Sequence, residues 1–214
     1  MQKSVYSLVL TDEIVAEIDR LAYELNTSRS NMINQILSDY VSLPTPEKRM
    51  REVFTELERL LTGDSVLTPL LQPSDSMYSL RSALSYKYNP TLKYSVELYG
   101  SAQPYFGELR VSVRSQNSTL MLTMLQFFKL WTRIENAYIG QTECCFENGR
   151  YARKLRYPSD GASNARIGEA ISDYIHAFDR AIKAYFDNLT SPQYALCMVE
   201  QIYADYVRAC GLIL

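Results

Sequence analysis

Cysteine and histidine, the side chains most suited to nucleophilic catalysis and zinc binding, are sparse in this chain of 214 residues, and nothing in the sequence selects a catalytic pair among its 24 carboxylates. The chain has a single histidine, and its four cysteines are Cys144, Cys145, Cys197 and Cys210. Structural zinc sites take four Cys or His ligands at characteristic spacings. There is no CxxC pair, so we expect reduced thiols, no metal site, and a packed or capping role for His176. Phosphate-binding glycine loops and nucleophile-elbow motifs are also absent. The sequence therefore predicts a protein without catalytic residues or cofactors, and not an enzyme.

The most basic stretch of the chain lies at residues 150–157 and mixes cations with tyrosines. Such mixing can bind a nucleic-acid backbone or another anion. It is more typical of a strand or solvated face whose arginines extend along the surface. Both interpretations stay open for this secondary anion contact, which comprises Arg150, Arg153, Lys154 and Arg156.

Net charge is −2, which argues against a protein that coats nucleic acid through bulk positive charge. The charges are unevenly distributed along the chain. Residues 1–63 hold seven Lys or Arg against ten Asp or Glu, whereas residues 64–157 hold eleven against seven. The middle of the chain is therefore its basic part.

The first forty residues predict one strand followed by two helices. Residues 4–10 alternate, with Tyr6, Leu8 and Leu10 on one face. Thr11 is expected to cap a first helix that runs to about residue 25, and Ser28 a second helix over residues 29–42. Pro44 and Pro46 end the second helix, because proline cannot continue its hydrogen-bond ladder.

A lone strand leaves its backbone groups unpaired, and a unit of about 40 residues rarely buries enough surface to be stable alone. The economical solution is a homodimer in which two copies of the strand pair antiparallel about a two-fold axis. The odd-numbered residues of the strand would then face outward.

Residues 4–42 resemble the ribbon-helix-helix family of bacterial and phage DNA-binding proteins, which includes the Arc and methionine repressors. The resemblance rests on the short strand, on the helix start at residues 10–13, on residues 18–22, and on the turn at residues 27–30, with Leu25, Ile33 and Tyr40. It implies that the paired ribbon enters the major groove of double-stranded DNA and that the start of the second helix binds phosphate. The base-facing positions would be Val5, Ser7 and Val9, and the phosphate-binding positions Ser28, Arg29 and Ser30. Lys3 precedes the ribbon and could reach the backbone as part of a short arm.

The ribbon departs from the family pattern, which usually places long polar or basic side chains at the outward positions. Valine offers only apolar contact, and Ser7 cannot make the bidentate pairing that discriminates bases best. Recognition would then be weak or would depend on DNA shape. An apolar ribbon is also what a protein-interaction module without DNA binding would show.

The rest of the chain predicts a helix over residues 47–62, a linker over 64–77, and an α+β domain. Alternating stretches at 78–88, 92–99 and 106–113 predict an antiparallel meander. Residues 140–161 are mixed in character, and helices are expected near residues 117–138, 165–188 and 192–210. We therefore expect a ribbon-helix-helix module at 1–46, a connecting helix and linker at 47–77, and an α+β domain at 78–214. Some family members carry a sensor domain in this layout, but the nickel-responsive type needs several His and Cys ligands.

Together these features predict a dimeric, sequence-specific transcriptional regulator such as a bacterial repressor, acting as a dimer or a dimer of dimers. The C-terminal domain would bind an unknown small ligand or protein partner, or provide oligomer contacts. Two alternatives stay open: a plasmid or mobile-element accessory protein (an antitoxin or relaxosome component), and a protein-interaction module. No apolar stretch approaches the ~20 residues that span a bilayer, and no signal peptide is evident. We expect no membrane contact and a cytoplasmic location.

Overall fold

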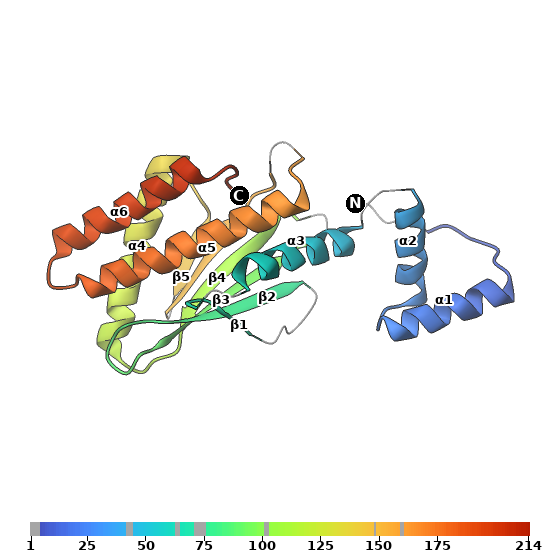
Figure 1. Ribbon diagram of the computed structural model, residues 1–214, viewed down its shortest axis with the longest axis horizontal. Coiled ribbons are helices and arrows are strands. Elements are labelled where there is room, and N and C mark those ends of the chain that lie inside the picture. The colour runs from blue at the N-terminus through green and yellow to red at the C-terminus, as the bar shows by residue number, and fades with distance from the viewer. Residues whose placement is uncertain are drawn as a thin grey trace.

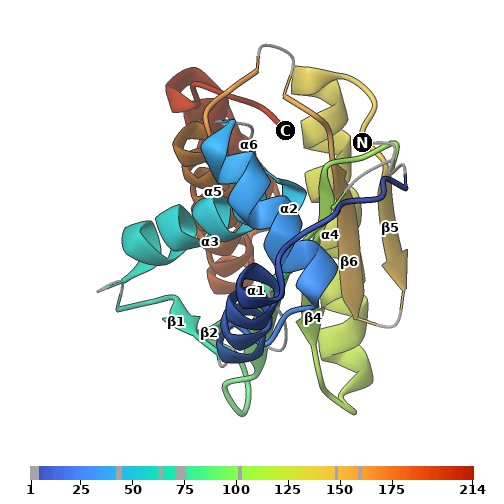
Figure 2. The same ribbon diagram turned by 90° about the vertical axis from the view of Figure 1, so that its right-hand side faces the viewer.

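The computed structural model of the chain describes residues 5–41, 45–62, 65–70, 76–100, 103–147, 149–158 and 161–214. It has an α+β fold with six helices and a six-stranded antiparallel sheet. The predicted fold class is therefore confirmed at this level. Two N-terminal helices stand apart from a larger body that holds the sheet and the other four helices (Figure 1). Figure 2 places these two helices in front of that body. Among the described residues, no helix has the length and apolarity needed to cross a membrane.

The N-terminal unit consists of α1 (Asp12–Glu24) and α2 (Arg29–Tyr40). Ser28 caps α2 as predicted, because its side chain accepts a hydrogen bond from the amide of Asn31 at 3.3 Å. Thr11 occupies the cap position of α1 but makes no side-chain cap hydrogen bond. The buried core of this unit comprises only Ile18, Ala22 and Met32. Two helices with so small a core are an incomplete folding unit.

The strand predicted over residues 4–10 is not formed in the single chain. Residue 4 lies outside the described residues, and residues 5–10 are exposed ahead of α1 and form no ladder with any described segment. The physical reason is that a strand is defined by its ladder, and none of the described segments of the same chain pairs with residues 5–10. The described part of the N-terminus thus has a helix as its first element, and the predicted strand is wrong for the single chain.

The sheet has the order β1-β2-β3-β4-β6-β5, with all neighbours antiparallel. The predicted three-strand meander is present at its centre. The β5–β6 hairpin was not predicted, and it lies in the stretch interpreted only as mixed. The strands are β1 (Thr68–Pro69), β2 (Met77–Ala83), β3 (Thr91–Leu98), β4 (Gly107–Val113), β5 (Cys144–Glu147) and β6 (Arg150–Leu155).

Helices cover one face of this sheet and share one large apolar core with it. They are α3 (Pro46–Leu61), α4 (Ser118–Ile139), α5 (Asn164–Asp187) and α6 (Pro192–Ala209). The sequence analysis placed α3 in a connecting segment, whereas its Val53, Leu57 and Leu61 are fully buried in this core. Gly168 of α5 permits that packing, since an added Cβ would lie 3.0 Å from the side chain of Glu56 and from the carbonyl of Val53.

A charged pair lies inside the core of the larger body. Arg153 of β6 donates from Nε to Glu135 of α4 at 2.7 Å, and the two side chains are 3% and 0% exposed. Tyr151 and Tyr174 donate to the same carboxylate at 3.3 Å, and Trp131 donates to Tyr174 at 2.8 Å. The carboxylate is therefore well supplied with donors, as a buried charge must be.

Replacing Arg153 with Met should destabilise the protein by about 3–5 kcal/mol, because Glu135 would be left as an unpaired buried charge. Urea unfolding checks this, with Arg150→Met as the matched control. Arg150 is an exposed arginine on the same strand, so its loss should cost within about 0.5 kcal/mol. Adding Glu135→Leu to Arg153→Met should recover most of the loss. Equal costs for the two arginines would contradict the assignment.

The free energy of unfolding that is lost in Arg153→Met should also depend on pH. Burial raises the pKa of Glu135, and Arg153 opposes that shift, so the Arg153→Met variant should have a still higher carboxyl pKa. A raised folded-state pKa gives stability that is present below the unfolded value and lost as pH rises through the folded value. The deficit of the variant should therefore be larger at about pH 8 than at about pH 5.

Candidate nucleic-acid interface

The segment before α1 presents its two predicted faces differently. Val5 and Val9 are 100% and 101% exposed, whereas Leu8 and Leu10 are 60% and 37% exposed. Ser7 is exposed as well. Leu8 and Leu10 are therefore less exposed than the predicted base-facing residues, although Tyr6 on the same predicted face is 83% exposed. Lys3 lies outside the described residues.

The predicted phosphate-binding residues Ser28, Arg29 and Ser30 lie side by side at the start of α2. Ser28 uses its hydroxyl to cap the amide of Asn31, and Ser30 is exposed at the second position of the helix. Amides in the first turn of a helix have no acceptor within the helix, so those of Arg29 and Ser30 are directed outward. An exposed helix start of this kind suits an anion.

Arg29 is less available than the sequence indicated. Its guanidinium forms a two-point ion pair with Asp19 of α1, with Nε donating to Oδ1 at 2.6 Å. The hydrogen bond from Arg29 lowers the pKa of the Asp19 carboxyl. The pair ties the middle of α1 to the first residue of α2 and so orients the helix start. No helical spacing predicts this pair, because the two residues are ten positions apart on different helices.

The basic run at residues 150–157 does not form one surface. Strand alternation places Arg150 and Lys154 on the open face of the sheet and Arg153 in the core. Arg153 is therefore not available for the anion contact considered for it, because its charge is neutralised by Glu135 inside the protein. No local pattern indicates this pair, since Glu135 lies in a different and largely apolar element, 18 residues before Arg153.

The other cations of the run are mostly engaged. Lys154 forms an ion pair with Glu108 and donates to the hydroxyl of Tyr99 at 3.2 Å. Partial burial acts to raise the pKa of Glu108, but hydrogen bonds from Lys154 and Arg110 outweigh it and lower that pKa. Arg156 donates to the carbonyl of Gln141. Arg150 alone of the four has neither an ion pair nor a side-chain hydrogen bond with a described residue.

Sequence reasoning missed the cations that lie beside Arg150. Arg81 of β2, Lys93 of β3 and Arg114 at the end of β4 share its face of the sheet. These residues are far apart in the chain, so no local run reveals them. Alternation within each predicted strand assigns their faces, but only the register of the strands brings them together.

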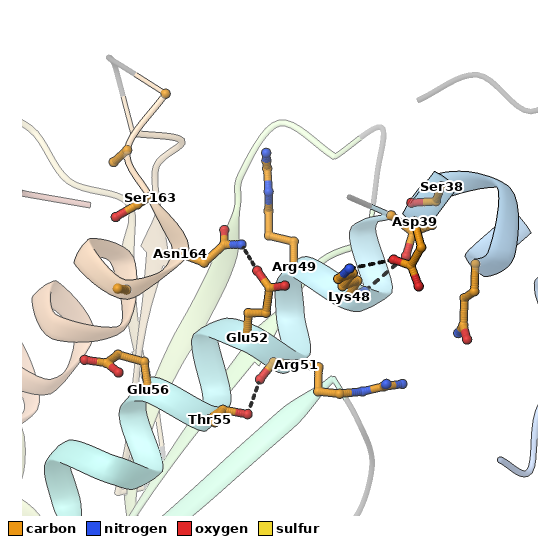
Figure 3. A pocket seen from close by; sticks show the side chains of 15 residues that line it. Ser38, Asp39, Lys48, Arg49, Arg51, Glu52, Thr55, Glu56, Ser163 and Asn164 are labelled. Carbon is orange, nitrogen blue, oxygen red and sulfur yellow. Dashed lines mark hydrogen bonds and ion pairs between the residues drawn. The ribbon is translucent and has the colours of Figure 1, made fainter. Parts of the chain in front are cut away.

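A hollow of about 800 Å³ lies where α2 and α3 meet the start of α5 (Figure 3). Lys48 pairs with Asp39 at 2.5 Å, and Asn164 donates to Glu52 at 2.5 Å. Cations and carboxylates are mixed along its walls, so the hollow favours neither sign of charge. Its described lining contains no cysteine or histidine that could serve as a nucleophile or base.

The residue types suited to metal or covalent chemistry are dispersed. All four cysteines are free thiols, and Cys144 lies 3.3 Å from the hydroxyl of Tyr151. His176 is half-buried, with Nδ1 2.9 Å from the carbonyl oxygen of Ser172. Within the described ranges, no group of three or more His, Cys, Asp or Glu side chains is placed to hold a metal ion.

Comparisons with protein-family models, with curated proteins and with solved structures found no match.

Proposed function

We propose that this chain is a dimeric DNA-binding regulator of transcription. Residues 4–42 of two copies would form a ribbon-helix-helix unit that enters the major groove. The observation that carries the proposal is the unfinished state of the N-terminal unit, which leaves apolar side chains exposed and backbone groups unpaired.

The exposed apolar surface of this unit is large compared with its core. Its two helices bury three apolar residues and leave many more in solvent. Contiguous apolar surface of this kind marks an interaction site. A second copy would complete a common core from the residues that remain exposed in one chain, which are Tyr6, Leu8, Leu10, Ile14, Leu25, Ile36, Leu37, Tyr40 and Val41.

The backbone supports the same arrangement. Two copies of residues 5–10 running antiparallel would satisfy each other's amide and carbonyl groups. Tyr6, Leu8 and Leu10 would then cover the helices, and Val5, Ser7 and Val9 would point away from them. A two-stranded ribbon with one free face fits the major groove.

The proposed phosphate contact relies on backbone amides more than on free charge. Arg29 is paired with Asp19, and the outer surface of α1 is acidic. Few phosphates would therefore be neutralised by this unit, and the dependence of affinity on salt should be shallow. Two helix starts, one from each copy, would hold the ribbon from both sides.

Selection of bound DNA from a random duplex pool tests the proposal directly. We expect enrichment of a short palindrome or tandem repeat that persists at about 0.15 M salt, because operator symmetry mirrors dimer symmetry. Binding at low salt without enrichment, or none at all, would reduce the ribbon to a dimerisation device and would favour the protein-interaction alternative.

Two neighbouring substitutions separate dimerisation from DNA contact. Leu8→Asp should abolish self-association, because a carboxylate would replace an apolar side chain between the ribbon and the helices. Val9→Asp places the same charge one residue later, on the outward face. That variant should remain dimeric but lose DNA binding by charge repulsion. Analytical ultracentrifugation and fluorescence anisotropy with the selected duplex measure the two effects. If both variants behaved alike in both assays, the alternation of faces would be refuted.

Ser30→Glu isolates the phosphate contact from the stability of α2. A glutamate in the first turn of a helix favours the helix dipole, so the fold should be retained. Near a phosphate the same charge should weaken DNA binding about tenfold or more. The matched control is Gln193→Glu, which adds one negative charge at the second position of α6 in the larger body. Equal DNA affinity for the two variants would show that the start of α2 does not contact DNA.

A further inference from the structure

One face of the sheet lies opposite the helices and carries a continuous row of charged and polar side chains. Strand register aligns Arg81, Lys93, Ser112, Arg150 and Glu147 across β2, β3, β4, β6 and β5. Neighbouring strands are about 4.8 Å apart, so the three cations of this row lie within about 15 Å. Residues from five different strands thus form one surface, and its three cations come from β2, β3 and β6.

The cations of this surface fall into two groups. Arg110 pairs with Glu97 at 2.8 Å and with Glu108, so its charge is already balanced. Arg81, Lys93, Arg114 and Arg150 form no ion pair and no side-chain hydrogen bond with any residue in the described ranges. Positive charges held close together repel one another, and an anion between them relieves that repulsion. The cations without an ion pair therefore outnumber Glu147, the carboxylate that lines the same part of the sheet.

The surface is also hollowed. The hollow is about 860 Å³, and every described residue that lines it lies in a strand or directly beside one. Its floor includes the short side chains of Ser95, Ser112 and Ala152, which leave room between the longer cations. This size lies within the range of small-molecule sites.

We propose that this hollow binds a small molecule carrying two or more phosphate groups. Guanidinium groups match phosphate oxygens through paired N–H donors, and a lysine adds a point charge. The strand positions on this face carry no aromatic side chain, so the surface offers no platform for stacking successive bases of a single-stranded nucleic acid. The inference rests on the sheet alone and is independent of the proposed DNA contact.

Calorimetric titration with inorganic tripolyphosphate at about 0.15 M salt tests the site. The full-length chain should bind the probe, and the double variant Lys93→Gln/Arg150→Gln should bind at least about tenfold more weakly. The matched control is Lys129→Gln/Arg133→Gln, which removes the same charge from exposed positions of α4 and should bind like the unchanged chain. Equal unfolding temperatures without the probe would show that all three proteins are folded.

Three outcomes would overturn the proposal. The unchanged chain could fail to bind tripolyphosphate, or the two double variants could weaken binding equally, which would mean general charge attraction. In the third outcome, tripolyphosphate does not bind, but Lys93→Gln/Arg150→Gln reduces the salt dependence of duplex DNA binding. The face would then be a contact for the DNA backbone and not a small-molecule site.

Discussion

A β-strand needs a neighbour, and the segment from Val5 to Leu10 has none among the residues that the structure describes. Its amide and carbonyl groups and its even-numbered apolar side chains are therefore in solvent. The helices behind it bury too few residues to stand alone. A partner strand from a second copy would supply hydrogen-bond partners for these backbone groups. The same copy would also bring a second set of apolar residues to bury. The proposed dimer, its two-fold symmetry and its free ribbon face all depend on this requirement.

The larger body pairs its strands and buries its apolar side chains within one chain. Its central strands are paired on both sides, one face is covered by helices, and α3 adds three fully buried side chains. The pair of Glu135 and Arg153 lies within this core and is held by two tyrosines. A body with its own core is rigid. The cations on the open face of its sheet are therefore held at fixed spacings.

The sequence predicted the elements that have strong local signals. Periodicity predicted the helices and the central meander. Ser28 was predicted as a helix cap, and the structure confirms this cap. The sequence did not predict the β5–β6 hairpin, whose short strands are interrupted by charge. It also misjudged Arg153, because a buried charge and an exposed one look alike until the partner on another element is known. The row from Arg81 to Arg150 depends on register, which is a long-range property that no local pattern carries.

Amide hydrogen exchange over residues 6–10 of the full-length chain tests the central claim most directly. The amides of a paired ribbon are protected, whereas those of an exposed segment exchange at the rate of an unstructured peptide. We predict slow exchange in this segment at concentrations where the chain is dimeric, further slowing with the selected duplex, and fast exchange in Leu8→Asp. Fast exchange at every concentration, with or without DNA, would contradict the paired ribbon and the DNA-binding function built on it.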